Sequence, residues 1–173
     1  MESLVIVSAT DQGAGTPDAL RRVASNCVPL VFASPHPAAR VIAQQAELGV
    51  RHPFVCDGGA ALYIPAGYFP ELARIGSSID GWHVVEFKPP YDSGRAVRLL
   101  ISLYRLCANE VTIIGLADAW RDRALLQVVD VPIVVRGDDG EAEQLLASVP
   151  SAYVTTARGL AGWSEAVLGS LAD

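Results

Sequence analysis

VTIIGLADAWRDRALLQVVDVPIVV, residues 111–135, carries the clearest indication of the fold class of this chain. A short apolar run at 111–114 is followed by an acidic loop that contains Asp118 and Asp122. A helical pattern comes next and leads into a second apolar run at 131–135. A strand, a loop, a helix and a strand in this order are typical of a parallel α/β sheet.

The rest of the chain continues this alternation of short apolar runs and helical patterns. Strands are expected at 4–7, 28–32, 54–56, 60–64, 82–87 and 153–155. Helices are expected at 16–26, 37–48, 93–104, 118–128, 138–148 and 162–171. Because strands alternate with helices throughout, the sequence predicts an α/β fold with a Rossmann-like, doubly wound, mainly parallel sheet and helices on both faces.

Length and composition limit the class of protein. At 173 residues the chain is long enough for one well-buried core, and its hydrophobic fraction of 51% is that of a globular protein. Thirteen Lys and Arg against nineteen Asp and Glu give a net charge of −6, which argues against nucleic acid or an anionic membrane as the main partner. No apolar run approaches the length of a bilayer span, and a cytoplasmic location is expected. Among the cysteines, Cys27 and Cys107 are expected to be small core residues.

Polar side chains follow three of the expected strands, at Ser8, at Ser34 and at Asp118. The carboxyl ends of parallel strands meet at one edge of a sheet, where ligands bind in open α/β folds. Asp118 and Asp122 are one helical turn apart, and two such carboxylates suit a hard cation such as Mg²⁺. The alternative is that Asp118 is a solvated residue at a helix start, where an N-cap oxygen is favoured.

Five segments resemble the haloacid dehalogenase-like hydrolases, and in detail the mannosyl-3-phosphoglycerate phosphatases. They are FVCDGGAALYIPAGYFP (54–70), WHVVEFKPPY (82–91), GRAVRLLISLYRL (94–106), GLADAWRDRALLQVVDVPIVV (115–135) and GLAGWSEAVL (159–168). The resemblance implies a phosphatase-type core in which Asp118 and Asp122 match the metal-loop aspartates. It also matches Ser34 to the small hydroxyl residue that follows the family's second strand.

Four positions depart from the family pattern. Ser8 and Thr10 stand where the family's first strand ends in D-x-D-G-T, whose first Asp attacks phosphorus and whose second handles the leaving-group proton. Neither residue is an ionised nucleophile at neutral pH. Ser93 replaces the phosphate-binding Lys, and Arg121 replaces an Asn of the metal loop. Because a guanidinium competes with a cation for nearby carboxylates, only a weak Mg²⁺ site is expected.

The family's cap domain has no counterpart in this sequence. In the relatives an inserted domain separates a segment like WHVVEFKPPY from one like GRAVRLL, whereas Tyr91, Asp92 and Ser93 join the two here. We therefore expect a small hairpin at 60–91 in place of the cap, and a single capless core over 1–173. The substrate of the relatives cannot be carried over, since the cap normally supplies specificity.

These departures predict a protein that has lost phosphomonoesterase activity and binds a phosphorylated small molecule or a protein partner. Arg121 and Arg95 offer a bidentate grip on phosphate, with Ser34 and Ser93 as further ligand-binding positions. The alternative is an active Mg²⁺-dependent phosphoric monoester hydrolase that uses a displaced carboxylate such as Asp11. Whether the chain is an enzyme stays open at this point.

A third arrangement would be a triad of Ser8, His36 and Asp118 at the same sheet edge, with His36 as general base. Against it, the sequence contains no nucleophile elbow of the form G-x-S-x-G. The alternative for His36, which lies between two prolines, is a solvent-facing loop residue.

Aromatic residues bear on partners. Tyr63, Tyr68 and Phe69 fall where a cap would be rooted, and Trp120 lies in the acidic loop. They form either an exposed patch that marks an interface or a satellite core against the short strands. We expect the first, and with it assembly into a homo-oligomer.

Overall fold

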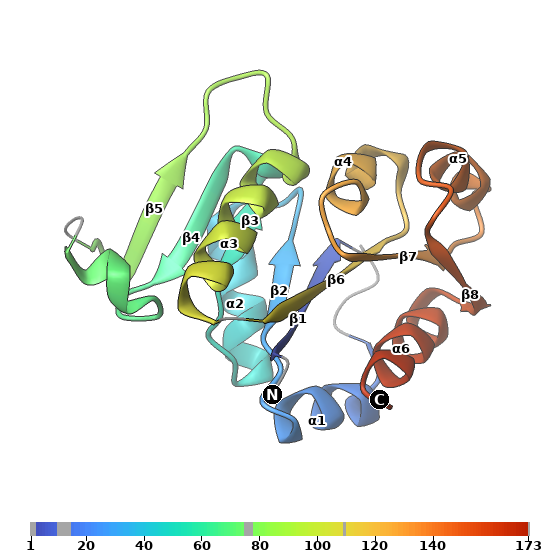
Figure 1. Ribbon diagram of the computed structural model, residues 1–173, viewed down its shortest axis with the longest axis horizontal. Coiled ribbons are helices and arrows are strands. Elements are labelled where there is room, and N and C mark those ends of the chain that lie inside the picture. The colour runs from blue at the N-terminus through green and yellow to red at the C-terminus, as the bar shows by residue number, and fades with distance from the viewer. Residues whose placement is uncertain (1–2, 10–14, 75–77, 109, 173) are drawn as a thin grey trace.

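The computed structural model describes residues 3–9, 15–74, 78–108 and 110–172. Within these residues eight strands form one sheet in the order β5-β4-β3-β2-β1-β6-β7-β8 (Figure 1). The strands are β1 (Ser3–Ala9), β2 (Leu30–Ala33), β3 (Phe54–Cys56), β4 (Ala61–Pro65), β5 (Trp82–Glu86), β6 (Val111–Ala117), β7 (Val131–Arg136) and β8 (Tyr153–Arg158). The pairings are parallel except those of β3 with β4 and of β4 with β5, so the prediction of a mainly parallel sheet is confirmed.

Helices cover both faces of the sheet. One face carries α1 (Pro17–Ser25), α2 (Ala38–Leu48) and α6 (Gly159–Ser170), and the other carries α3 (Ser93–Cys107), α4 (Arg123–Leu126) and α5 (Glu141–Ser148). Successive side chains of β1 point to opposite faces of the sheet. Ile6 packs in the core under the first set of helices, and Val5 and Val7 pack in the core under the second set. The doubly wound arrangement is confirmed. No helix in the described part of the chain is long and apolar enough to cross a membrane.

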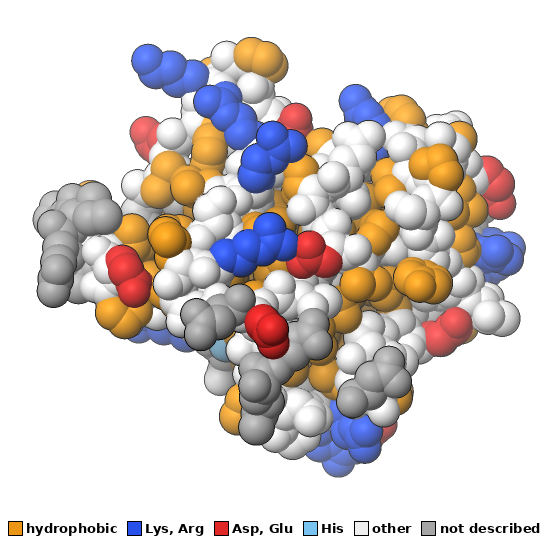
Figure 2. Space-filling model, viewed as in Figure 1, with side chains coloured by type: hydrophobic (Ala, Val, Ile, Leu, Met, Phe, Trp, Pro, Cys, Tyr) orange, Lys and Arg blue, Asp and Glu red, His pale blue; other side chains and the backbone are white. Residues whose placement is uncertain are grey.

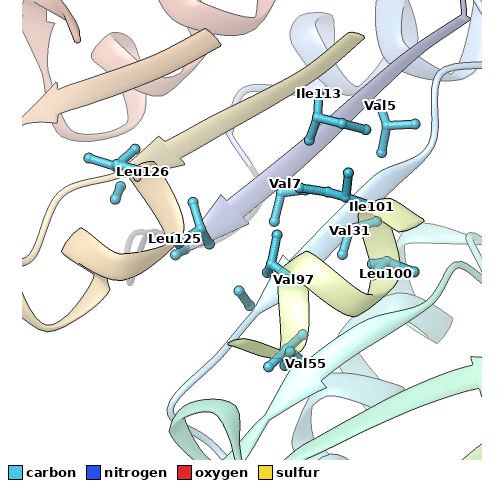
Figure 3. Close-up of a cluster of buried hydrophobic side chains, with 14 of the residues drawn as sticks. Val5, Val7, Val31, Val55, Val97, Leu100, Ile101, Ile113, Leu125 and Leu126 are labelled. Carbon is cyan, nitrogen blue, oxygen red and sulfur yellow. The ribbon is translucent and has the colours of Figure 1, made fainter. Parts of the chain in front are cut away.

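The packing of α3 on the sheet shows why these residues form a helix here. Val97, Leu100 and Ile101 recur at helical spacing and lie against Val5 and Val7 of β1 in one buried cluster (Figure 3). The central strands are covered on both sides, so their sequences are continuous β-branched and apolar runs rather than alternating ones.

An antiparallel hairpin stands at one end of the sheet, as predicted. It consists of β4 and β5, and residues 87–92 connect it directly to α3 (Figure 1). Asp92 is the N-cap of α3, where its Oδ1 accepts a hydrogen bond of 2.9 Å from the backbone N–H of Arg95. No domain is inserted between β5 and α3, all of whose connecting residues are described.

Several predicted boundaries are wrong. β6 does not stop at Gly115 but continues to Ala117. A Cβ at Gly115 would lie 2.7 Å from Cγ2 of Val129, so the glycine permits close packing instead of ending the strand. The helix expected over 118–128 is a short turn, η3 (Trp120–Asp122), followed by α4. The two are separate because Asp122, the last residue of η3, departs from α-helical backbone angles with φ −96° and ψ 10°.

The prediction that Cys27 and Cys107 are core residues is also wrong, since both are exposed. Cys27 lies in the turn after α1 with φ +54°, and Cys107 is the last residue of α3, where its thiol donates to Glu71 Oε2 at 3.0 Å. The buried cysteine is Cys56.

The aromatic residues at the hairpin fold inward instead of forming a patch. Phe69 is buried, and Tyr68 packs edge-on against Phe69 and Tyr104. Tyr63 stacks on Phe54 with ring centroids 5.0 Å apart. These contacts form the satellite core that was the alternative prediction, so the prediction of an exposed aromatic patch is wrong for these residues. Self-association itself stays a prediction.

Candidate functional site

The sheet register brings the predicted strand-end residues to one edge. β1 lies between β2 and β6, with Ser8 opposite Phe32 on one side and Ala9 opposite Ala117 on the other. Ser34 and Asp118 therefore follow their strands on either side of the point where β1 ends. The meeting of these three strand ends is as predicted from the parallel order.

Ser8 is buried, and its hydroxyl contacts a side chain of α6. Trp163 of α6, which is fully buried, donates a hydrogen bond of 2.9 Å from Nε1 to Ser8 Oγ. The other side of the indole packs on Gly15, where a Cβ would fall 2.0 Å from the ring. The position that resembles the family's nucleophile is therefore part of a packed contact between β1 and α6. Trp163 gives no signal of this role in the sequence, because a buried Trp in a helix is ordinary core.

A cavity of about 300 Å³ opens beside Ser8. Its lining comes from the end of β1, the loop after β2 and one side of α2: Ser8, Phe32, Ala33, Ser34, Pro35, His36, Arg40, Ala43, Gln44 and Glu47. Ser34 Oγ accepts the backbone N–H of His36 at 3.1 Å, which fixes the loop between the two prolines. Arg40 adds a guanidinium that sequence patterns do not indicate, since an exposed Arg on a helix is usually only solvated.

A second group of predicted residues meets around Asp122. Asp122 is buried, and Ser93 Oγ of α3 donates to its Oδ1 at 3.4 Å. Arg121 Nε lies 3.5 Å from the other carboxylate oxygen, Oδ2. Ser93, Arg121 and Asp122 thus form one cluster, in which the carboxylate has a hydroxyl on one oxygen and a guanidinium on the other.

The acidic loop that carries this cluster is fixed from both sides. The backbone N–H of Trp120 donates to the carboxylate of Glu141 at the start of α5, and the backbone N–H of Asp122 donates to Ala119 O at 3.0 Å. The guanidinium of Arg123 lies over the Trp120 ring, 4.7 Å from its centroid. Glu141 is a further residue that sequence patterns do not indicate, because the first turn of any helix favours an acidic residue.

The residues present fit a divalent cation poorly. Among the residues that the structure describes, no cluster of three or more His, Cys, Asp or Glu side chains is placed to hold a metal ion. Asp118 and Asp122 are two carboxylates, and both oxygens of Asp122 have Ser93 or Arg121 as neighbours. A weak Mg²⁺ site stays a prediction.

Arg95 is not brought to the cavity by any contact among the described residues. Its guanidinium donates to Lys88 O at 3.3 Å and lies over the Phe87 ring, 5.6 Å from the centroid. It belongs to the exposed side of α3, and Figure 2 shows Lys and Arg side chains gathered over α3 and the loop that precedes it. Its predicted role as a phosphate ligand gains no support from this placement.

The structure bears on the predicted triad but not on the displaced carboxylate. Thr10 and Asp11 lie outside the described residues, so their predicted positions stay untested. For the triad, Ser8 and His36 line the same cavity, but none of the hydrogen bonds between described residues joins Ser8 Oγ to the His36 ring. Ser8 Oγ instead accepts the indole N–H of Trp163, which gives the triad no support.

Comparisons with known proteins place the fold. No protein-family model matches the chain. Over 92 residues, 50% of this chain but only 30% of the relative, it is 33% identical to a glucosyl-3-phosphoglycerate/mannosyl-3-phosphoglycerate phosphatase of Methanococcoides burtonii. Its fold is similar to that of protein 0175 of Thermoplasma acidophilum, with a TM-score of 0.63, 13% identity and 99% of each chain covered. It is also similar to the HAD subclass IIB sugar phosphatase BT4131, with a TM-score of 0.61, 10% identity, and 97% of this chain and 98% of that chain covered.

Proposed function

From the haloacid dehalogenase-like hydrolase fold of this chain, we propose that it binds a phosphorylated small molecule at the carboxyl edge of the sheet without hydrolysing it. The observation that carries the proposal is the buried state of Ser8. Where the resemblance expects an attacking carboxylate, a neutral hydroxyl accepts a hydrogen bond from the indole of Trp163.

Loss of hydrolysis follows from the chemistry of that position. In-line attack on phosphorus requires an activated nucleophile with its reacting atom about 3–3.5 Å from the target. A serine hydroxyl needs a base, and among the described residues no His ring is hydrogen-bonded to Ser8. Among the described residues, the group hydrogen-bonded to Ser8 Oγ is the indole N–H of Trp163, a donor that cannot take a proton from the hydroxyl.

Binding of a phosphorylated molecule is supported by the lining of the cavity. Its volume of about 300 Å³ is at the lower end of the range for small-molecule sites. Ser34 Oγ accepts from His36 N and so keeps its own proton to donate, and Arg40 presents a guanidinium suited to bidentate contact with phosphate. The amino end of α2, whose N-cap Pro37 makes no side-chain cap, adds a favourable dipole for an anion.

The test combines turnover with binding. We expect wild-type protein with Mg²⁺ to release no phosphate from p-nitrophenyl phosphate or a panel of sugar phosphates above an Asp118→Ala background. In titration calorimetry with inorganic phosphate and the same panel, Arg40→Ala should weaken binding by roughly tenfold, about 1.4 kcal/mol. Arg21→Ala on α1, an exposed Arg that pairs with Asp18 and does not line the cavity, is the matched control and should change nothing.

The outcomes distinguish a binding protein without hydrolysis from an active phosphatase. Turnover that Asp118→Ala abolishes would overturn the proposal, and further loss in Asp11→Asn would favour the displaced-carboxylate phosphatase. No binding of any phosphorylated probe, or equal binding by Arg40→Ala and wild type, would remove this cavity as the site. A protein partner and a homo-oligomer are separate predictions. Light scattering across a wide concentration range would test the homo-oligomer, and a monomer throughout would count against it.

A further inference from the structure

The loop between β6 and α4 has the chemistry of a cation site but already contains a positive charge. Asp118 and Asp122 each have one carboxylate oxygen, Oδ1 and Oδ2 respectively, that is shielded from solvent. Shielded carboxylate charge is costly unless a cation or hydrogen-bond donors compensate it. A positive group near these carboxylates would offset their negative charge.

Among the described residues, Arg121 places a positive charge on this loop. Its Nε is 3.5 Å from Asp122 Oδ2, and the Asp122 side chain is only 10% exposed. On the opposite oxygen, Oδ1, the hydroxyl of Ser93 donates at 3.4 Å. A metal ion that used Asp122 would have to displace one of these two groups or share an oxygen with it.

The position of Arg121 is set by its neighbours in the loop. The turn Trp120–Asp122 is closed by the hydrogen bond from Asp122 N to Ala119 O, and Trp120 N is held by Glu141. The other nearby guanidinium, that of Arg123, is engaged elsewhere, because it stacks on the Trp120 ring and donates to Trp120 O at 3.4 Å.

We propose that Arg121 is the resident cation of this loop and is the residue that determines its selectivity against divalent metal ions. The guanidinium neutralises Asp122 permanently, so Mg²⁺ binds only by competing with a tethered positive charge. The loop then works as a fixed salt-bridged structure whose charge does not depend on metal supply. This inference does not depend on the phosphorylated ligand proposed above, because it concerns the metal alone.

The experiment removes the charge and titrates the metal. Arg121→Asn replaces the guanidinium by a neutral amide whose oxygen can itself act as a ligand. We expect Mg²⁺ to bind this variant at least roughly tenfold more tightly than wild type in titration calorimetry. We also expect Mg²⁺ to raise the melting temperature of Arg121→Asn while leaving that of wild type unchanged. Tb³⁺, a luminescent hard cation, gives a local readout because Trp120 in the same loop can sensitise it.

Matched variants separate charge from shape. Arg121→Lys keeps the positive charge and should gain no Mg²⁺ binding, and Arg123→Gln removes an adjacent guanidinium that does not contact Asp122 and should likewise gain none. Arg121→Asn combined with Asp118→Ala should lose whatever the single variant gained. If Arg121→Asn fails to fold without metal, recovery of its circular dichroism by Mg²⁺ supports the proposal. Wild-type Mg²⁺ affinity equal to that of Arg121→Asn, or a gain of equal size in Arg123→Gln, would overturn it.

Discussion

Trp163 Nε1 donates a hydrogen bond of 2.9 Å to Ser8 Oγ, although the two residues are 155 positions apart in the chain. The contact joins α6 to the end of β1 inside the core, and both side chains are buried. It ties the last helix of the structure to the strand end around which the candidate site is built.

This contact predicts a measurable coupling energy. Trp163→Phe should lower the free energy of unfolding by roughly 2–3 kcal/mol, because it removes buried volume and the indole donor together. Ser8→Ala should cost less. In a double-mutant cycle by urea denaturation, the interaction energy should be about 1 kcal/mol. Ser102→Ala on the exposed side of α3 is the control for serine truncation, and additive effects of the Trp163 and Ser8 changes would contradict the prediction.

Gly59 and Gly58 form a natural pair for testing the junction between β3 and α3. Both have positive φ, +104° and +66°, so an alanine at either position is strained by about 1–2 kcal/mol. At Gly59 an added Cβ would also lie 2.2 Å from the backbone carbon of Asp92, whereas at Gly58 it would meet nothing within 4 Å. We therefore expect Gly59→Ala to cost about 3 kcal/mol or more, well beyond Gly58→Ala.

Thermal and urea unfolding of the two glycine variants would measure this difference. The steric cost at Gly59 falls on the first turn of α3, so loss of helical circular dichroism at a lower temperature should accompany it. Equal costs for the two variants would mean that the α3 terminus moves aside freely, contrary to its close contact with the β3 loop.

The strand ends at the site could be predicted from the sequence because they follow from local patterns. Short β-branched runs fix the parallel strands, and parallel strands place Ser34 and Asp118 on either side of the end of β1. The hydrogen bond from Trp163 to Ser8 and the lining of the cavity by Arg40 depend on how helices pack on the sheet. Hydrophobic periodicity indicates which side of a helix is buried, but it does not indicate which residue of the sheet that side contacts. The sequence therefore could not predict these two contacts.

The burial of Tyr68 was left open in the sequence for the same reason. Its environment depends on Tyr104 of α3 and His52 before β3, which no local pattern brings together. His52 Nδ1 lies 3.1 Å from Tyr68 Oη, and Tyr68 Oη lies 3.0 Å from Tyr104 Oη. Burial raises the pKa of both tyrosine hydroxyls and lowers the pKa of His52.

The lowered pKa of His52 predicts an acid-sensitive step in stability. In the unfolded chain His52 takes up a proton near its ordinary pKa of about 6.5, whereas the folded protein resists protonation at that pH. The unfolded state therefore binds more protons as the pH falls below about 6.5, and the free energy of unfolding decreases in that window. Above pH 7.5 this contribution is constant.

Urea unfolding at a series of pH values between 7.5 and 5 would measure the effect of His52. The variant His52→Gln keeps a neutral hydrogen-bonding group beside Tyr68 and should lose stability less steeply with falling pH than wild type. His83→Gln, on β5 of the hairpin and away from Tyr68, serves as the comparison. Parallel curves for wild type and His52→Gln would rule out His52 as the source.

The contact between Trp120 and Glu141 gives a direct optical test of how the acidic loop is held. The backbone N–H of Trp120 donates to the Glu141 carboxylate, which anchors the loop to the first turn of α5. Trp120 is 38% exposed, whereas Trp82 and Trp163 are 9% and 0% exposed, so collisional quenching of tryptophan fluorescence reports mainly on Trp120.

Glu141→Ala should release the loop and raise the acrylamide quenching constant, while Glu143→Ala on the same turn should leave it unchanged. Glu141→Gln retains an acceptor oxygen and should fall between them, at a cost to stability of about 1 kcal/mol or less, since the neutral amide makes a weaker hydrogen bond than the carboxylate. An unchanged quenching constant in Glu141→Ala would show that the turn of Trp120–Asp122 and the Arg121 contact hold the loop without α5.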